Sequence, residues 1–168
     1  MAFAYYNRLS KTRQAIYRKS ARVVSIPLAD VRPLQMASQS LQAALFEEDR
    51  RTTRAACQVL AEGVTERLSI PTVEVQVLAA RPHDESGELH GLYNPAEGGS
   101  PARICVWMRT AKRRQVVAFK SFLRTLLHEL CHHIDYEYLR LAESFHTEGF
   151  YQRESSLFHQ LFHDECTG

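Results

Sequence analysis

The residues FKSFLRTLLHELCHHI, numbered Phe119 to Ile134, contain the pattern H-E-x-x-H at positions 128–132. The apolar residues of this stretch recur at spacings of three and four, and no Gly or Pro interrupts them. This periodicity predicts one amphipathic helix of roughly 18 to 24 residues with the pattern in its second half. On that helix His128 and His132 lie one turn apart and project from the same face.

The H-E-x-x-H pattern suits a metal-dependent hydrolase. Two imidazoles one turn apart can hold one Zn²⁺, and the carboxylate of Glu129 between them can act on a metal-bound water. The pattern is short and also arises by chance, in which case His128 and His132 would be hydrogen-bonded histidines of a core helix. The helical context and a further histidine downstream favour the zinc site.

A catalytic zinc usually takes three protein ligands and leaves one position for water or substrate. We favour His146 as the third ligand, because enough chain precedes it for the motif helix to end and turn back. A second amphipathic stretch, from Thr147 to Phe162, begins beside it. Glu143 or Glu148 would instead give a site of two histidines and one glutamate, and both stay open. The other downstream residues with ligand side chains are Glu154, His159 and His163.

Several neighbours of the motif are candidates to support the metal or the transition state. Asp135 follows His132 by three residues and could orient its imidazole through the second ring nitrogen, or else be a solvated carboxylate at the helix end. Tyr93 could direct its phenol toward a developing oxyanion, or pack in the core as an aromatic residue of a strand. His133 points about 100° away from His132, so we expect it at the surface or behind a ligand. Further possible donors are Tyr136, Tyr138 and Tyr151.

The run from Phe119 to Phe162, about a quarter of the chain, resembles the SprT-like (Spartan-like) branch of the zincin metallopeptidases. In that family a helical H-E-x-x-H is followed by a downstream histidine and a nearby aromatic residue, as His146 and Phe150 follow it here. The resemblance implies a zincin-like domain that holds zinc and hydrolyses peptide bonds. The positions that match are the metal ligands His128, His132 and His146 and the general base Glu129.

Zincins typically run an edge strand along the cleft beside the metal, where an extended peptide adds through main-chain hydrogen bonds. In this chain Arg103–Arg109 or Glu88–Tyr93 is expected to supply that strand.

The remainder of the chain predicts an α+β fold. We expect a zincin-like domain in which a small, mostly antiparallel sheet of about three strands packs with helices. Residues 1–33 are expected to form a basic N-terminal leader or peripheral segment, and residues 34–168 a single catalytic domain. The expected helices, besides the motif helix and the terminal one, span 34–46 and about 48–68, and the expected strands span 72–79, 88–93 and 103–109.

Composition bounds the class of protein and its compartment. A chain of 168 residues that is 45% hydrophobic and 24% charged is ordinary for one globular domain. It contains no run resembling a signal-peptide core and no 18 consecutive apolar residues, so we expect neither secretion nor membrane spanning. The cysteines form no C-x-x-C pair, which fits a reduced cytoplasmic protein, and Cys131 is expected to pack as a small hydrophobic residue. The four cysteines are Cys57, Cys105, Cys131 and Cys166.

The net charge is only +2, but its distribution is uneven. Residues 1–29 and residues 98–128 contain Lys and Arg but no acid. A basic stretch that leads into the motif helix could favour acidic substrates or a nucleic-acid backbone, and a solvated charged face is the alternative. We expect His159 and His163, four residues apart on the terminal helix, to form an exposed polar stripe.

These observations predict a zinc-dependent metallopeptidase that acts on a protein or peptide, with Glu129 as the general base. Two alternatives stay open. The chain could be a zinc-containing regulatory or nucleic-acid-binding module without proteolysis, or a zinc amidase or deacylase.

Overall fold

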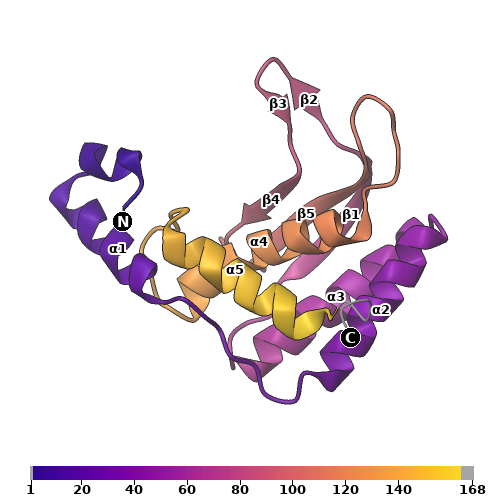
Figure 1. Cartoon of the computed structure of the whole chain (residues 1–168), viewed down its shortest axis with the longest axis horizontal. Coiled ribbons are helices and arrows are strands. Elements are labelled where there is room, and N and C mark those ends of the chain that lie inside the picture. The colour runs from indigo at the N-terminus through magenta and orange to yellow at the C-terminus, as the bar shows by residue number, and fades with distance from the viewer. Residues whose placement is uncertain (1, 164–168) are drawn as a thin grey trace.

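The computed structural model describes residues 2–163 and has the predicted α+β architecture (Figure 1). The helices are η1 (Ala4–Arg8, a 3-10 turn), α1 (Lys11–Arg22), α2 (Arg32–Phe46), α3 (Arg50–Arg67), α4 (Phe119–Glu137) and α5 (Glu148–Leu161). The strands are β1 (Glu74–Ala80), β2 (His83–Asp84), β3 (Gly87–Glu88), β4 (Gly91–Asn94) and β5 (Arg103–Arg109). The predicted motif helix is α4, with 19 residues, and the predicted terminal helix is α5.

The main sheet is mixed, so the prediction of a mostly antiparallel sheet is wrong. Its strand order is β1-β5-β4, with β1 parallel to β5 and β4 antiparallel to β5. The chain reverses direction between β1 and β4 and again between β4 and β5, which restores the direction of β1 and inserts β5 in the middle. Since β5 is central, Arg103–Arg109 is excluded as an edge strand, and β4 is an edge.

The strand expected at Glu88–Tyr93 is divided in the structure. Glu88 pairs with His83 in a separate two-stranded hairpin, β2–β3, which projects from the sheet at the top of Figure 1. The hairpin turn is set locally, because Asp84 accepts hydrogen bonds from Ser86 and because Gly87 adopts φ 120°, a conformation that side-chain-bearing residues rarely adopt. The main sheet resumes only at β4.

Side-chain caps mark where several helices begin. Ser10, Asp49 and Thr147 precede α1, α3 and α5, and each accepts a hydrogen bond from a backbone N–H of the first turn. Such caps satisfy donors that have no partner within the helix. The cap at Thr147 is important for the site, because it fixes the start of α5 directly after His146.

One hydrophobic core joins the helices to the sheet. Helix α4 contacts β4 and β5, and α5 packs along α4 (Figure 1). Inward residues of β1 and β5 are in register, with Val75 beside Ile104 and Val77 beside Val106. The buried stripe of α4 comprises Phe122, Leu123, Leu126, Leu127, Leu130 and Ile134. Its burial fixes the rotation of α4, and therefore the direction in which His128 and His132 point.

The N-terminal segment packs against α5, although it lies more than a hundred residues away in the sequence. The contact centres on Arg153 of α5, whose fully buried guanidinium donates hydrogen bonds to the carbonyls of Ser20 and Val23 at 2.6 and 2.7 Å. Tyr17 of α1 is also buried. The predicted domain boundary after residue 33 stays a prediction.

Cys57, Cys105 and Cys131 are buried with free thiols, and Cys166 lies outside the described residues. The expected packing of Cys131 as a small hydrophobic residue is confirmed, since it is 1% exposed within the core. Among residues 2–163, no helix combines the length and the apolar character needed to cross a membrane.

Candidate metal centre

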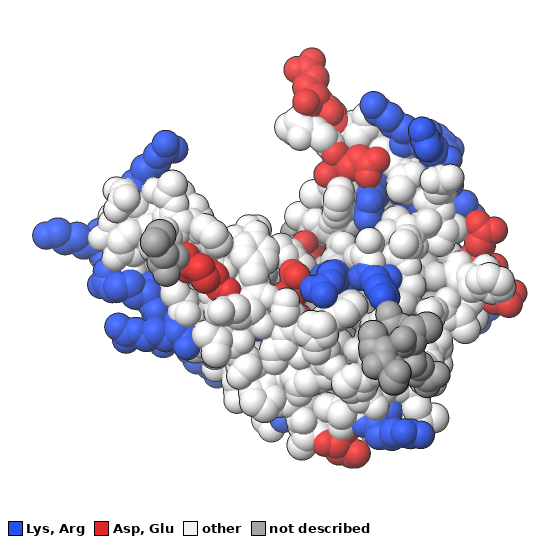
Figure 2. All heavy atoms as spheres, viewed as in Figure 1, with Lys and Arg blue, Asp and Glu red and all other residues white. Residues whose placement is uncertain are grey.

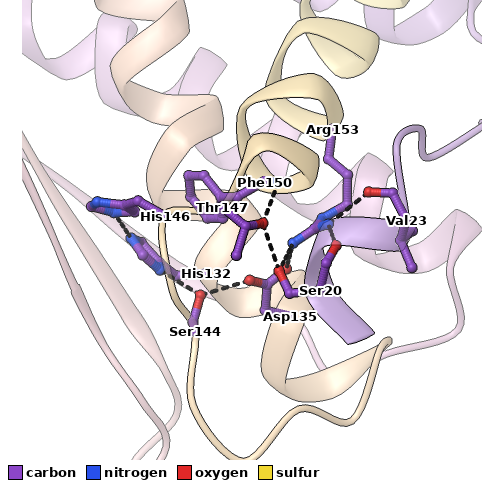
Figure 3. A network of polar contacts seen from close by, with 9 residues as sticks. All are labelled: Ser20, Val23, His132, Asp135, Ser144, His146, Thr147, Phe150 and Arg153. Atoms are coloured by element: carbon purple, nitrogen blue, oxygen red, sulfur yellow. Dashed lines mark hydrogen bonds and ion pairs between the residues drawn. The ribbon is translucent and has the colours of Figure 1, made fainter. Parts of the chain in front are cut away.

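The imidazoles of His128, His132 and His146 lie close together beside α4. One ligand atom from each of His128, His132 and His146 can be chosen so that all three atoms lie within 4.8 Å of one another. The Nε2 atoms of His132 and His146 are 3.1 Å apart and face each other in Figure 3. Two nitrogens that bind one tetrahedral zinc at its usual bond length are about 3.3 Å apart, so the cluster has the dimensions of a metal site. These three residues could hold one metal ion.

Local structure explains why these side chains meet. His128 and His132 are four residues apart on α4, and His146 ends the loop that leads into α5. Phe150, in the first turn of α5, packs against all three imidazoles, with ring centroids 4.8 to 5.0 Å away. The side chain of Phe150 is fully buried, so the three imidazoles pack on an apolar ring.

The second ring nitrogen of each helical histidine is held by another side chain. His128 Nδ1 lies 2.8 Å from a carboxylate oxygen of Glu154, and His132 Nδ1 lies 2.7 Å from Ser144 Oγ. Partners of this kind fix the tautomer and the orientation of a ligand imidazole and leave its Nε2 free for the metal.

Asp135 acts on His132 through a third residue. Ser144 donates its hydroxyl to Asp135 at 2.7 Å and accepts from His132, so the three side chains form a chain that continues to Arg153 (Figure 3). Asp135 is fully buried and pairs with Arg153 at 2.9 Å, and the alternative of a solvated helix-end carboxylate is therefore wrong. Burial raises the pKa of Asp135, whereas Arg153 and Ser144 lower it.

Glu129 lies beside the imidazoles, where two cavities meet. One cavity, of about 350 Å³, also contains Arg124, Tyr151 and Glu154 in its wall, and we call it the Arg124 cavity. The second cavity, of about 280 Å³, is lined by Tyr93, Tyr136 and Ser144 among others. Gly91 of β4 lines both.

The position of Glu129 depends on Gly91. A Cβ atom at Gly91 would lie 2.9 Å from Glu129 Cγ and 2.9 Å from Thr125 Cγ2, so any side chain at this position would displace the side chains of Glu129 and Thr125. Burial raises the pKa of the Glu129 carboxyl; the neighbouring Glu154 raises it further and His128 lowers it. A carboxyl group with a raised pKa is a better base near neutral pH.

The protonation state of His132 suits a ligand. Burial, followed by the positive charge that His128 and His146 can carry, lowers the pKa of His132 to about 3. Its ring is therefore neutral near pH 7, and a neutral imidazole is the form that binds a metal.

The other predicted supporting residues have different partners. The phenol of Tyr93 lies 2.8 Å from His133 Nδ1, and His133 Nε2 lies 2.7 Å from the carbonyl of Pro71. The carbonyl can only accept, so His133 Nε2–H donates to it and His133 Nδ1 accepts a hydrogen bond from the hydroxyl of Tyr93. His133 is 1% exposed, and the expectation of a surface position is wrong because both ring nitrogens are satisfied inside. The ring of Tyr93 stacks on that of His132, with centroids 6.3 Å apart.

The alternative third ligands are engaged elsewhere. Glu143 forms an ion pair with Arg13 at 2.9 Å, and Glu148 accepts a hydrogen bond from Tyr17. His159 and His163 are both exposed, as predicted, but α5 ends at Leu161, so the expected stripe on one helix is wrong because His163 lies beyond the helix end. Within residues 2–163, the group formed by His128, His132 and His146 is the only cluster of three or more metal-binding side chains.

The three other tyrosines differ in their distance from the cluster. The ring of Tyr151 lies 5.8 Å from that of His146 and 6.2 Å from that of His128. Tyr136 stacks on Tyr93, and Tyr138 is exposed at the end of α4. Tyr151 is therefore the phenol best placed to assist chemistry in the Arg124 cavity.

The sequence did not reveal the roles of Glu154 and Ser144. From the sequence, Glu154 was a candidate only as a metal ligand. It follows Phe150 by four residues, and this spacing is the one sequence signal that both side chains lie on the helix face toward α4. Ser144 carries no pattern at all, because its contact with His132 depends on how the loop after α4 folds back. Comparison of the chain with protein-family models, with curated proteins and with solved structures finds no match.

Proposed function

We propose that this chain is a zinc-dependent metallopeptidase with a zincin-like catalytic site. The observation that carries the proposal is the convergence of His128, His132 and His146 on one point beside Glu129. Three imidazoles with a cavity beside them suit zinc, since catalytic zinc takes three protein ligands and keeps one position open. When bound, the ion would acidify a water and polarise the scissile carbonyl. Membership in the SprT-like branch stays a prediction.

Glu129 performs the proton transfers in this proposal. It accepts a proton from the attacking water as the water oxygen bonds to the carbonyl carbon, and it returns that proton to the amine nitrogen as the C–N bond breaks. No covalent bond to the protein forms. Its raised pKa makes the carboxylate a stronger base for the first of these transfers. Tyr151 supplies a phenol toward the developing oxyanion.

The edge strand β4 is the proposed docking site for the peptide. It runs beside α4, and its Gly91 lies next to Glu129 at the junction of the two cavities. An extended peptide that pairs with a free sheet edge gains main-chain hydrogen bonds and places alternate side chains in pockets. The scissile bond would then lie at Glu129, with one cavity on each side.

Metal analysis combined with a conservative variant tests the proposal. The purified protein should contain about one zinc per chain and cleave unfolded protein or peptide substrates, and chelation should abolish cleavage until zinc is restored. Glu129→Gln should keep the zinc and lose about 10²- to 10⁴-fold in kcat, because it removes the general base. Glu66→Gln, at an exposed position of α3, serves as the control and should have no effect.

Other results would redirect the assignment. A protein that binds no zinc in metal-replete buffer would contradict the proposal outright. Hydrolysis of acylated amines but not of peptides would indicate an amidase or deacylase. Salt-dependent nucleic-acid binding without any hydrolysis, unchanged by Glu129→Gln, would indicate a binding module.

A further inference from the structure

A guanidinium group lines the cavity beside the proposed metal. Arg124 precedes His128 by one helical turn on α4, and both side chains belong to the wall of the Arg124 cavity together with Glu129 and Tyr151. Figure 2 shows Lys and Arg side chains beside the central hollow, where α4 and α5 lie. An arginine at this position is not needed to hold the metal or to transfer protons, so it is available to bind substrate.

The guanidinium is held in place by an aromatic ring. Its central carbon lies 3.9 Å from the ring centroid of Phe158, which is a buried residue of α5. A guanidinium that stacks by its face keeps its N–H donors free at the edge of its plane. These edge donors match the two oxygens of a carboxylate. Among residues 2–163, no acidic side chain forms an ion pair with Arg124.

The acids nearby have other roles. Glu154 holds His128 at 2.8 Å, and Glu129 is buried beside the imidazoles. Neither forms an ion pair with Arg124, and a bound metal would add positive charge to the same cavity. The wall also contains two imidazoles, the proposed ligand His128 and the exposed His90, whose Nε2 lies 4.0 Å from a carboxylate oxygen of Glu88.

We propose that the Arg124 cavity is a substrate subsite that binds a carboxylate group. This inference rests on the proposed peptidase function for its position beside the scissile bond. The four residues from Arg124 to His128 span about 6 Å along the helix, and an extended peptide rises by about 3.3 Å per residue. The carboxylate recognised by Arg124 therefore belongs within about two residues of the cleaved bond. It can be an Asp or Glu side chain or the free α-carboxylate at the end of a peptide.

Matched peptides test this subsite. A peptide that the protein cleaves is prepared with Glu, Gln or Lys at each of the two positions on either side of the bond, with the C-terminus amidated. The zinc-loaded wild type should cleave the Glu peptide about 10-fold or more faster in kcat/KM than the Gln peptide, at positions on one side of the bond. Two further peptides contain no Asp or Glu and end close to the cleaved bond, one with an amidated and one with a free C-terminus. Faster cleavage of the second would show that Arg124 binds an α-carboxylate and not an acidic side chain.

Variants at Arg124 assign the preference to this residue. Arg124→Gln should remove the preference for Glu, and Arg124→Glu should transfer it to the Lys peptide. Arg124→Lys should keep only part of it, because a lysine cannot form the two-point contact. Arg54→Gln removes an exposed arginine from α3 as a charge-matched control and should keep the wild-type preference.

A binding measurement separates this inference from the proposed function. Fluorescence anisotropy with zinc-loaded Glu129→Gln, with and without Arg124→Gln, reports binding of the same peptides without cleavage. Hydrolysis without a carboxylate preference would overturn the subsite and keep the peptidase. Binding that depends on the carboxylate and on Arg124, with no hydrolysis by the wild type, would support the subsite and overturn the peptidase. If the peptides are neither bound nor cleaved, the carboxylate subsite and the proposed peptidase function are both contradicted.

Discussion

The imidazoles of the candidate site are held in different ways. His128 is anchored by a carboxylate and His132 by a hydroxyl that is itself bound to a buried carboxylate. His146 is exposed, and it is positioned through its backbone, since Tyr5 donates a hydrogen bond to its carbonyl at 2.9 Å. Changes to Glu154 or Ser144, which contact the imidazoles directly, should therefore alter metal affinity.

Ser144→Ala should weaken zinc binding. The variant removes the contact that holds His132 Nδ1 and leaves the carboxylate of Asp135 without that donor. Loss of such an outer contact typically costs about 10- to 100-fold in metal affinity. Competition with a zinc chelator measures the change, and Ser121→Ala, at an exposed position of α4, is the control. Equal affinities in the wild type and in Ser144→Ala would show that this hydroxyl does not position the ligand.

The carboxyl of Glu129 should make the metal-free protein less stable as pH rises. Its pKa is raised in the folded state, mainly by burial, so folding favours the protonated form. The folded protein therefore loses stability as pH rises from the ordinary pKa of Glu, 4.5, through the raised value. Glu129→Gln mimics the protonated form and should be more stable than the wild type near pH 7, with the difference vanishing below about pH 4.

Urea unfolding of the metal-free wild type and of Glu129→Gln at a series of pH values measures this difference. A stability gap that stays constant from about pH 4 to pH 7 would contradict a raised pKa at Glu129.

At the scale of elements, the approach of β4 to α4 sets the geometry of catalysis. Gly91→Ala should lower kcat by about 10-fold or more while the zinc content stays unchanged. The added methyl group meets the flexible side chain of Glu129 at 2.9 Å, so this carboxylate must move whereas the helix can stay in place. Displacements of this size at a reacting group carry large rate costs. Steady-state kinetics and metal analysis of the same preparation test it, and wild-type kcat in Gly91→Ala would contradict the account.

The sequence predicted the elements better than their arrangement. The period of α4 and the bounds of β5 followed from local patterns, because each pattern reports burial along its own segment. The mixed sheet could not be predicted from local patterns, because the direction of each strand depends on how the chain returns after the β2–β3 hairpin. In the candidate site, the spacing of His128 and His132 by four residues predicted that both lie on one face of a helix. The contacts of Ser144 and Glu154 with these histidines could not be predicted, because they depend on how the loop and α5 pack against α4.

At the scale of the whole molecule, one buried ion pair connects the N-terminal segment to the candidate site. Arg153 binds the carbonyls at the end of α1 and pairs with Asp135, whose other oxygen reaches His132 through Ser144 (Figure 3). The position of α1 is thereby linked to a proposed metal ligand more than a hundred residues further along the chain.

Breaking this pair should destabilise the fold. Asp135→Asn leaves the guanidinium of Arg153 buried without its counter-charge, which costs about 3 to 5 kcal/mol. The double variant Asp135→Asn, Arg153→Met should lose less than the sum of the two single variants, because it removes both charges. Denaturant unfolding of the metal-free proteins measures the three values. Asp30→Asn, at an exposed residue whose carboxylate lies 3.9 Å from Arg67, is the control and should cost less than about 1 kcal/mol.

The most direct test of the central claim is anomalous diffraction at the zinc edge from crystals of the zinc-loaded protein. The account predicts one peak that lies about 2.0 to 2.1 Å from a ring nitrogen of each of His128, His132 and His146. Glu129 should lie beside that peak without binding it directly. A peak at another place, a zinc bound by Glu143 or Glu148 in place of His146, or no zinc at all would contradict the account.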